Sequence, residues 1–500
     1  MRENDFPTEI RPYLIPSPSG RLVYRCLGCR REYEADSLFY TCPECRGVFL
    51  IEDQAAGRLA ERPGEFWRRL FDYRKMLNRP ALKGVFLFHE FLCPMVPLED
   101  VVYLGEGHTP VVGANQALRE MVGTPFYFKN DGQNPSASFK DRGMAAALSY
   151  LKYLVRKKGL KEVLSVCAST GDTSAAAALY ASYLAGEVKS AVLLPKGKVT
   201  PQQLSQPLGS GAQVFELPGV FDDCMKVVEH LADNYDVALL NSKNAWRVLG
   251  QESYSFEVAQ QFDYRVKNLS LFLPIGNAGN ITAILSGLLK FERYGLIDGL
   301  PRVFGVQSAH ADPVFRYYSQ PPDQRLWRPI TVRPSVAQAA MIGNPVSMPR
   351  VLHLAEEYEK RAGEPRFFVV QVEEQEIMDS MLRANRNGFV ACTQGGESLA
   401  GLRQALKQGL IKPGDQAVLD STAHALKFAE FQNRYFDDDF TPEFEIKPRA
   451  ELKNRPRYIR PSDLPRVPGP DTVLDPDEFK TFVQTTAREI AQALGLKPKD

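Results

Sequence analysis

Residues 134–143 read NPSASFKDRG, a stretch that combines a turn, an aromatic residue and a cluster of charges. An Asn-Pro pair and two serines are typical of a turn, and an aromatic residue such as Phe139 is typical of a buried position. Lys140 follows at the point where the loop gives way to a helix. One interpretation is a helix start with a solvated cluster of charges. The other is a lysine whose sheltered amine has a lowered pKa and attacks carbonyl groups to form a Schiff base.

Outward from this stretch, from about residue 100 onward, short apolar runs alternate with longer Ala-rich or amphipathic segments. The short runs have the length and composition of strands, and the longer segments have the pattern of helices. This alternation predicts an α/β fold in which parallel sheets are covered by helices on both faces. The predicted strands are 162–168, 190–194, 213–217, 237–240, 271–275, 302–307, 367–372 and 416–419.

Two loops that follow predicted strands have the composition of anion-binding sites. Residues 167–176 read CASTGDTSAA, and residues 273–283 read LPIGNAGNITA. Ligands of such sheets bind beyond the carboxyl ends of the strands, and N–H groups at a helix N-terminus favour a carboxylate or phosphate. Neither loop matches the dinucleotide-binding or Walker A pattern. Taken singly, each loop is also consistent with an ordinary turn and helix cap.

Four of the eight cysteines form a regular pattern near the N-terminus, C-x2-C, twelve residues, C-x2-C. They are Cys26, Cys29, Cys42 and Cys45. Such pairs place four sulfurs around one tetrahedral centre, which predicts a zinc ribbon flanked by strands at 31–33 and 48–51. A four-thiolate site has no open position, so the Zn²⁺ would be structural. The alternative is four buried or redox-active cysteines.

The composition is that of a soluble globular protein of roughly two to four structural units. Of the 500 residues, 44% are hydrophobic and 24% are charged, and the net charge is +1. This balance argues against a strongly basic nucleic-acid partner. The N-terminal residues have no signal-peptide pattern, and no stretch approaches the roughly 18 apolar residues of a membrane span. We expect a cytoplasmic protein without a membrane partner.

A sheltered lysine near two anion loops suits pyridoxal 5′-phosphate, and further segments support this cofactor. Together with NPSASFKDRG they are LGEGHTP (104–110), ASTGDTSA (168–175), NSKNAWRVLGQ (241–251), PIGNAGNI (274–281), IGNPVS (342–347) and STAHALKF (421–428). The set resembles threonine synthase over roughly residues 24–430. SFKD alone indicates only the fold group, which includes dehydratases and cysteine-forming synthases. IGNPVS and the pattern N-S-x-N-x-x-R-x-x-x-Q indicate threonine synthase itself.

The resemblance implies a fold type II pyridoxal-phosphate enzyme, similar to the tryptophan synthase β chain. Two doubly wound sheet domains would hold the cofactor between them. The expected regions are a zinc ribbon (1–52), a helical connector (53–99), a catalytic region (100–430) and a Pro-rich extension with a terminal helix (431–500). Within the catalytic region, the smaller subdomain would be about 145–255, and the larger one 100–144 with 256–430.

The resemblance also implies a role for each matching residue. Lys140 would form the aldimine with the cofactor and then move protons, and Thr422 would lie by the pyridine nitrogen. The residues expected to hold the cofactor phosphate are Gly276, Asn277, Ala278, Gly279 and Asn280. Those expected at the substrate carboxylate are Ser169, Thr170, Gly171 and Thr173, and those expected at the substrate phosphate are Asn241, Ser242 and Arg247. Asp172 would border the cofactor, but some relatives have Asn there, so its contact is open. His424 has no assigned role.

The implied reaction converts O-phospho-L-homoserine and water to L-threonine and phosphate, a carbon–oxygen lyase step of amino-acid biosynthesis. One alternative is another reaction on this scaffold, such as serine or threonine dehydration or β-replacement. A second is a non-catalytic scaffold whose zinc ribbon binds a protein or RNA. The default expectation for the assembly is a homodimer. A helix that begins at Asp475 and Pro476 is expected near the end of the chain.

Overall fold

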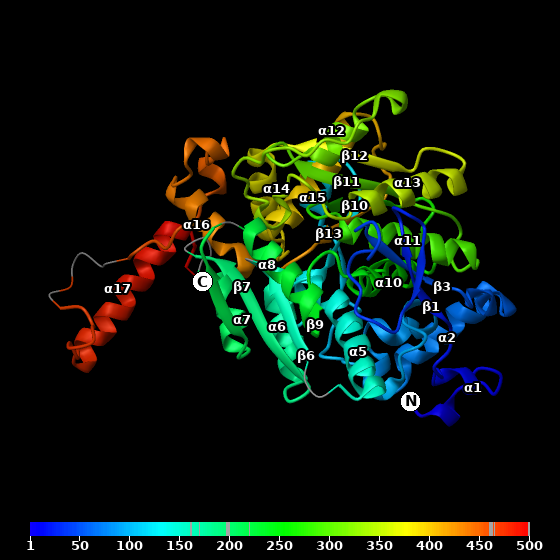
Figure 1. Ribbon diagram of the computed structural model, residues 1–500. Coiled ribbons are helices and arrows are strands. Elements are labelled where there is room, and N and C mark those ends of the chain that lie inside the picture. The colour runs from blue at the N-terminus through cyan, green and yellow to red at the C-terminus, as the bar shows by residue number, and fades with distance from the viewer. Residues whose placement is uncertain are drawn as a thin grey trace. The chain divides into compact units, whose positions relative to one another are not determined.

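The computed structural model describes residues 1–160, 163–169, 171–196, 201–219, 221–459, 464 and 466–498 (Figure 1). The chain forms two compact units, residues 1–447 and 448–500. The first unit contains a three-stranded, a four-stranded and a six-stranded sheet. Within the described ranges, no helix is both long and apolar enough to cross a membrane.

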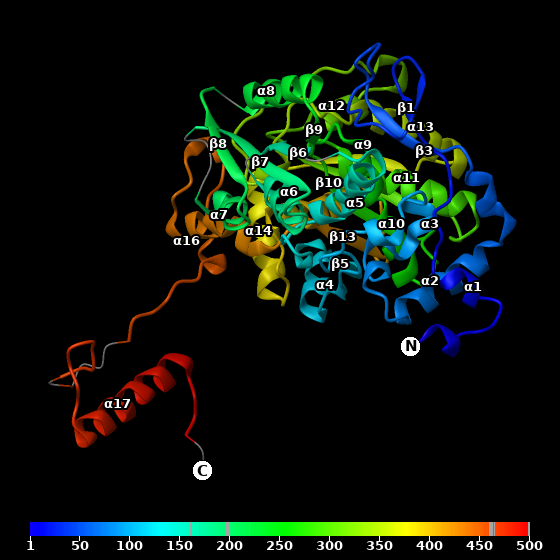
Figure 2. The same cartoon turned by 60° about the horizontal axis from the view of Figure 1, so that its bottom comes forward.

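The four-stranded sheet is parallel and has the strand order β8-β7-β6-β9 (Figure 2). Its strands are β6 (Val163–Ala168), β7 (Val188–Pro195), β8 (Gln213–Leu217) and β9 (Val237–Leu239). Helices α6 (Asp172–Tyr183) and α7 (Pro201–Gly209) lie on one side of the sheet in Figure 2, and α8 (Phe221–Asn234) lies on the other. Helices on both faces make this a doubly wound sheet.

The six-stranded sheet has the order β12-β11-β10-β13-β5-β4 and is parallel except for the edge strand β4. Its strands are β4 (Val111–Gly113), β5 (Phe126–Asn130), β10 (Ser270–Pro274), β11 (Arg302–Ser308), β12 (Phe367–Val372) and β13 (Ala417–Ser421). All eight strands predicted beyond residue 100 are confirmed, with ends that differ by at most two residues. No strand was predicted at β4 or β5.

Two layers of helices cover the six-stranded sheet. On one face lie α14 (Glu374–Arg386) and α15 (Thr393–Lys407), and α11 (Gly279–Arg293), α10 (Ser253–Gln261) and α13 (Met348–Ala362) lie on the other (Figure 1). The other helices of this region are α4 (Gln116–Val122), α5 (Lys140–Lys158), α9 (Ala245–Gln251), α12 (Pro313–Tyr318) and α16 (Ala429–Asp437). The predicted α/β, doubly wound fold is therefore confirmed.

The N-terminal sheet is antiparallel, with β1 (Leu22–Cys26) between β2 (Glu32–Glu34) and β3 (Phe49–Asp53). The strands predicted at 31–33 and 48–51 are confirmed with a shift of one or two residues, and β1 is additional. A connector follows, with α2 (Gly64–Met76) and α3 (His89–Leu92) as its α-helices, and α1 (Arg11–Leu14) precedes the sheet.

Aromatic side chains join this connector to the larger sheet region. Phe71 of α2 and Phe91 of α3 contact Phe291 of α11, with ring centres 6.3 and 5.5 Å apart. Phe291 in turn stacks on Phe256 of α10 at 4.2 Å. All four rings are buried, so apolar burial stabilises this junction.

The unit of residues 448–500 contains α17 (Pro476–Leu494). Asp475 caps this helix by accepting hydrogen bonds from the N–H groups of Asp477 and Glu478, which confirms the predicted helix start. The predicted Pro-rich extension begins within a helix, because α16 spans residue 431.

Candidate active site

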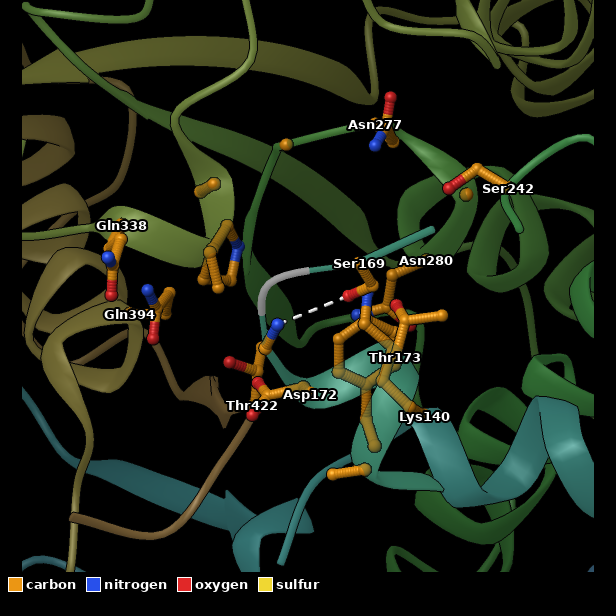
Figure 3. A pocket seen from close by; sticks show the side chains of 18 of the residues that line it. Lys140, Ser169, Asp172, Thr173, Ser242, Asn277, Asn280, Gln338, Gln394 and Thr422 are labelled. Carbon is orange, nitrogen blue, oxygen red and sulfur yellow. Dashed lines mark hydrogen bonds between the residues drawn. The ribbon is translucent and has the colours of Figure 1, made fainter. Parts of the chain in front are cut away.

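A cavity of about 770 Å³ lies at the carboxyl ends of strands from both parallel sheets (Figure 3). Its wall includes the ends of β6, β10 and β13, the start of α5 and parts of the segment 241–251. This is the usual place for a ligand in an α/β protein. The predicted residues that line it are Lys140, Ser169, Gly171, Asp172, Thr173, Asn241, Ser242, Arg247, Gly276, Asn277, Ala278, Gly279, Asn280 and Thr422. Thr170, also predicted, lies outside the described residues.

Lys140 is the first residue of α5, and a tight turn directs it to the cavity. Ala137 in this turn has a positive φ of 62°. The N–H of Phe139 donates to the carbonyl of Thr422 over 2.8 Å, which fixes the turn against the end of β13. The Lys140 Nζ atom lies 4.2 Å from the centre of the Phe139 ring. The turn and the ring therefore shelter the amine.

The pKa of the Lys140 amine is lowered from 10.5 to about 8. Burial is the largest cause, because a less polar environment disfavours the charged ammonium. The Arg247 guanidinium lowers the pKa further, whereas the Asp172 carboxylate opposes this change. An amine with this pKa is largely neutral a little above pH 8, so it can attack a carbonyl carbon and can accept and return protons.

A buried network of charges holds the start of α5. The Arg142 guanidinium donates to the carboxylates of Asp131, at 2.7 and 2.9 Å, and Glu257, at 2.6 and 2.8 Å. The Lys129 ammonium also pairs with Glu257, at 2.7 Å. Asp141 and Arg142 are absent from the described lining of the cavity. Both residues anchor the helix start. Arg142 does so through the ion pairs given above, and the Asp141 carboxylate accepts a hydrogen bond from the N–H of Ser136 over 2.8 Å.

The glycine-containing loop 276–280 joins β10 to α11. Ala278 has a positive φ of 61°, and Gly279 begins the helix. A Cβ atom on Gly276 would lie 2.9 Å from the Cα of Ala340, so only glycine fits there. The nearest atoms to a Cβ on Gly279 would be 3.8 and 4.0 Å away, which leaves room beside the helix N-terminus. The loop therefore presents N–H groups to an anion in the cavity.

The Asn280 side chain is oriented by a buried carboxyl group. Its Nδ2 donates to Asp420 Oδ2 over 2.8 Å, and its Oδ1 has no hydrogen-bond partner among the described residues. Burial raises the pKa of Asp420 well above its ordinary value. One of the two N–H groups of the Asn280 amide is therefore engaged by Asp420.

Arg247 brings a buried positive charge to the cavity. Its side chain donates to the carbonyl of Leu240 over 2.9 Å, and its Nε has no partner in the described part of the chain. Burial lowers the pKa of its guanidinium to about 10. None of the ion pairs between described residues includes it. A buried guanidinium without a carboxylate is a strong site for a phosphate or carboxylate ligand.

Asn241 connects two segments of the cavity wall. Its side-chain amide donates to the carbonyl of Ala168 over 2.6 Å and accepts from the N–H of Ala168 over 3.0 Å. Both ends of the amide are therefore bound to the end of β6. Asn241 therefore holds the loop that carries Ser242, and these bonds use one of the two N–H groups of its amide.

Asp172, whose contact the sequence left open, pairs with Lys427. The Lys427 Nζ lies 2.9 Å from Asp172 Oδ1 and donates to the carbonyl of Ser136 over 2.9 Å. Asp172 belongs to α6 beside the smaller sheet, and Lys427 follows β13 of the larger sheet. The ammonium compensates the carboxylate, so Asp172 is compatible with an anionic ligand nearby.

Four glutamines and Lys427 line the cavity without having been predicted as site residues. The glutamines are Gln206, Gln251, Gln338 and Gln394. Gln394, on α15, is 2% exposed, and both atoms of its amide lack a partner among the described residues. Figure 3 shows Gln338 and Gln394 across the cavity from Ser242. Gln251 ends a motif that was recognised, but α15 follows no predicted strand, so nothing in the sequence indicated Gln394.

The four N-terminal cysteines lie close enough to share one metal ion. Their sulfur atoms all lie within 4.8 Å of one another. A Cβ on Gly28 would lie 2.9 Å from Cys45 Sγ, so glycine permits the close approach of this knuckle. Four thiolates in this arrangement suit Zn²⁺ in a closed tetrahedral site.

The cavity also fits pyridoxal 5′-phosphate. It combines a lysine with a lowered pKa, a helix N-terminus with open space at Gly279, and a hydroxyl group at Thr422. Arg247 and Gln394 add unsatisfied donors that the cofactor or its substrate can use.

Comparison with known proteins agrees with this geometry. Residues 102–422 match the pyridoxal-phosphate dependent enzyme family. Threonine synthase from Methanocaldococcus jannaschii is 33% identical over 414 residues, which cover 81% of this chain and 93% of that protein. Threonine synthase 2, chloroplastic, from Arabidopsis thaliana is 32% identical, over 85% of this chain and 80% of that protein.

Solved structures show the same fold at lower identity. The crystal structure of threonine synthase from Escherichia coli has a TM-score of 0.61 and 21% identity, and covers 82% of this chain and 90% of its own. The crystal structure of threonine synthase from yeast has a TM-score of 0.58 and 17% identity, and covers 87% of this chain and 94% of its own. The predicted fold type II architecture is confirmed. The chain belongs to the pyridoxal-phosphate dependent enzyme family and, within it, to the threonine synthases.

Proposed function

We propose that this chain converts O-phospho-L-homoserine and water to L-threonine and inorganic phosphate, with pyridoxal 5′-phosphate bound at Lys140. One observation carries the proposal: a lysine with a pKa of about 8 shares a cavity with the buried Arg247, which has no acidic partner among the described residues. A phosphorylated amino acid supplies the anion that Arg247 lacks. The relatives named threonine synthase support the same product.

The cofactor supplies an electron sink for the substrate carbons next to the amino group. The proposed contacts of its phosphate are the backbone N–H groups of loop 276–280 at the N-terminus of α11. The Thr422 hydroxyl would lie by the pyridine nitrogen, and Lys140 by the aldehyde carbon. Asp172, neutralised by Lys427, would border the ring.

The substrate has two anionic groups, and each is proposed to bind a different segment: the carboxylate binds at the start of α6, and the phosphate binds at the segment 241–247. Residues proposed at the carboxylate are Ser169, Thr170, Gly171 and Thr173. Arg247 and Ser242 are proposed at the phosphate, because the guanidinium forms paired hydrogen bonds with such an anion. Asn241 positions this segment through its two hydrogen bonds to Ala168.

Lys140 moves the protons in this scheme. Its neutral amine would accept the proton of Cα, release it, and then accept one proton of Cβ as the phosphate leaves Cγ. Its ammonium would return protons to Cγ and to Cα, while water supplies the hydroxyl to Cβ and its remaining proton goes to the released phosphate. Arg247 stabilises the negative charge that gathers on the phosphate as its bond to Cγ breaks.

We further propose one structural Zn²⁺ at the four N-terminal cysteines, a cytoplasmic location and a homodimeric assembly. We also propose the boundaries at residues 52, 99 and 430 between the ribbon, the connector, the catalytic region and the C-terminal extension. Elemental analysis of purified protein tests the zinc, with an expected ratio near one ion per chain that falls in Cys42→Ser. Light scattering tests the dimer, and a monomeric mass contradicts it.

The decisive assay gives purified protein O-phospho-L-homoserine and measures threonine and phosphate together, in equal amounts. Arg247→Met should raise KM for this substrate by roughly ten- to a hundredfold, because it removes hydrogen bonds to a charged group. Production of 2-oxo acid from free threonine or serine, without turnover of phosphohomoserine, would identify a dehydratase instead. Absence of a visible absorption band after addition of pyridoxal phosphate would favour the non-catalytic scaffold.

A further inference from the structure

The segment 241–247, which carries Ser242 and Arg247 into the cavity, is contacted from behind by the N-terminal sheet. Figure 2 shows β1 and β3 next to α9, and β3 packs directly on that helix. The Trp246 indole N–H donates to the Tyr24 hydroxyl of β1 over 2.8 Å. Tyr24 and Trp246 are 1% and 2% exposed, so water does not replace this hydrogen bond.

The Trp246 ring is held on a second side by α5. Tyr150 stacks on it with ring centres 3.6 Å apart and an angle of 13° between the planes. The hydroxyl groups of Tyr24 and Tyr150 both donate to the carbonyl of Ser37, at 2.8 and 3.1 Å. The position of the Trp246 side chain, next to Arg247 in the sequence, is thus fixed by its contacts with β1 and α5.

Arg350 of α13 makes a second connection between the same two parts. Its guanidinium donates to the carbonyl of Phe49 in β3 over 2.7 Å and to those of Ser242 and Lys243 over 3.1 Å each. Arg350 is fully buried, and its hydrogen-bond partners among the described residues are all neutral oxygens. One side chain therefore joins β3 to the loop that presents Ser242.

Both contact points lie close to the cysteine cluster. In the β1–β3 pair, Phe49 lies opposite Cys26. Tyr24 precedes Cys26 by two residues in β1. The turn after β1 is tied to β3 by the N–H of Leu27, which donates to the carbonyl of Val48 over 3.1 Å. The cysteine cluster therefore lies at the end of the two strands that make both contacts.

We propose that the ribbon is part of the substrate site: the four-cysteine cluster, acting through Tyr24 and Phe49, positions the segment 241–247 so that Arg247 meets the phosphate of the substrate. Tyr24, Trp246 and Arg350 are positioning residues. The inference rests on the proposed function for the identity of the substrate. The ribbon contacts described above do not include Lys140, Thr422 or loop 276–280, so cofactor binding should be unaffected by their loss.

Tyr24→Phe in the holoenzyme tests this, because it removes the hydroxyl that accepts from Trp246 and donates to Ser37. KM for O-phospho-L-homoserine should rise by roughly five- to a hundredfold, the range expected when a buried donor loses its partner. The inhibition constant of inorganic phosphate should also rise, while the visible absorption of the bound cofactor stays unchanged. Trp246→Phe removes the donor instead, and the effects of the two substitutions should be less than additive in the double variant.

Tyr358→Phe is the matched control. Its buried hydroxyl donates to the carbonyl of Pro301 over 2.9 Å, and it is absent from the described cavity lining. It should lower the melting temperature without a change in KM. If Tyr24→Phe and Trp246→Phe also lower only the melting temperature, the proposal is overturned and the ribbon merely stabilises the fold. If phosphohomoserine is not turned over but phosphate binding still depends on Tyr24, the proposed function fails and the positioning role is supported.

Discussion

The reactivity of Lys140 depends on the charges of a few neighbouring residues. Burial is the main reason that its pKa is about 8, and the charges of Arg247 and Lys427 lower it further. Asp172 acts in the opposite direction. Because Lys427 lies 2.9 Å from Asp172, the two charges largely cancel at the amine.

Substitution of either partner should move the titration of Lys140 in a predictable direction. Lys427→Met removes a cation and leaves Asp172 unpaired, so the pKa of Lys140 should rise. Asp172→Asn removes an anion, so the pKa should fall. The measurement is the rate at which cofactor-free protein takes up pyridoxal phosphate, as a function of pH. This rate should increase through about pH 8 in the unsubstituted protein, since the neutral amine reacts.

Lys412→Met, at an exposed position, is the control for the loss of a lysine and should leave the profile unchanged. Shifts in the same direction for Lys427→Met and Asp172→Asn would contradict the electrostatic account. An inflection near pH 10.5 in the unsubstituted protein would contradict the lowered pKa itself.

At the level of elements, the start of α5 is fixed by buried charges rather than by a cap. Phe139 precedes the helix and makes no side-chain cap hydrogen bond. Arg142 and Lys129 neutralise Asp131 and Glu257 in the fully buried network described above. A change of any member leaves an uncompensated charge in the interior.

Arg142→Met should therefore lower the free energy of unfolding by about 3–5 kcal/mol, because two carboxylates lose their partner. Chemical denaturation followed by circular dichroism measures this change. Arg293→Gln is the control, since this half-exposed arginine pairs with Glu357 on the surface and should cost less than about 1 kcal/mol. Equal effects of the two substitutions would show that the buried network is not an anchor.

The loop before α11 leads to a second prediction at this scale. Gly276→Ala places a Cβ 2.9 Å from the backbone of Ala340, so the loop must shift and its N–H groups lose their alignment. The dissociation constant for pyridoxal phosphate should rise about tenfold or more, which fluorescence titration measures. Gly57→Ala is the control, because no described atom lies within 4 Å of a Cβ there. Unchanged cofactor binding in Gly276→Ala would argue against a phosphate site at this loop.

The elements differ in how well the sequence predicted them. Central strands such as β10 and β11 were predicted because strands buried on both faces read as short apolar runs. β5 reads FYFKN and contains Lys129, whose charge hides a buried strand; its partner Glu257 is adjacent only in the fold. The position of Gln394 on α15 was unpredictable for a similar reason, since only packing brings this helix to the cavity.

For the whole molecule, the described residues that form the cavity all belong to the unit of residues 1–447. A chain that ends at Lys447 should therefore fold, bind pyridoxal phosphate and keep its KM for O-phospho-L-homoserine within about twofold. Calorimetry and steady-state kinetics test this expectation. A large loss of soluble protein, with recovery when residues 448–500 are restored, would assign these residues a role in stability or assembly.

The order of amino acids was enough to predict the types of chemistry in this protein. A lysine after a turn, glycine loops after strands and paired cysteines are local patterns, and local backbone geometry follows from neighbouring residues. The partners of the charged groups depended on the fold. Lys427 reaches Asp172, and Arg350 reaches Phe49 and Ser242, between segments far apart in the sequence. Hydrogen bonds and ion pairs act over a few ångströms, so only tertiary packing decides which of these groups meet.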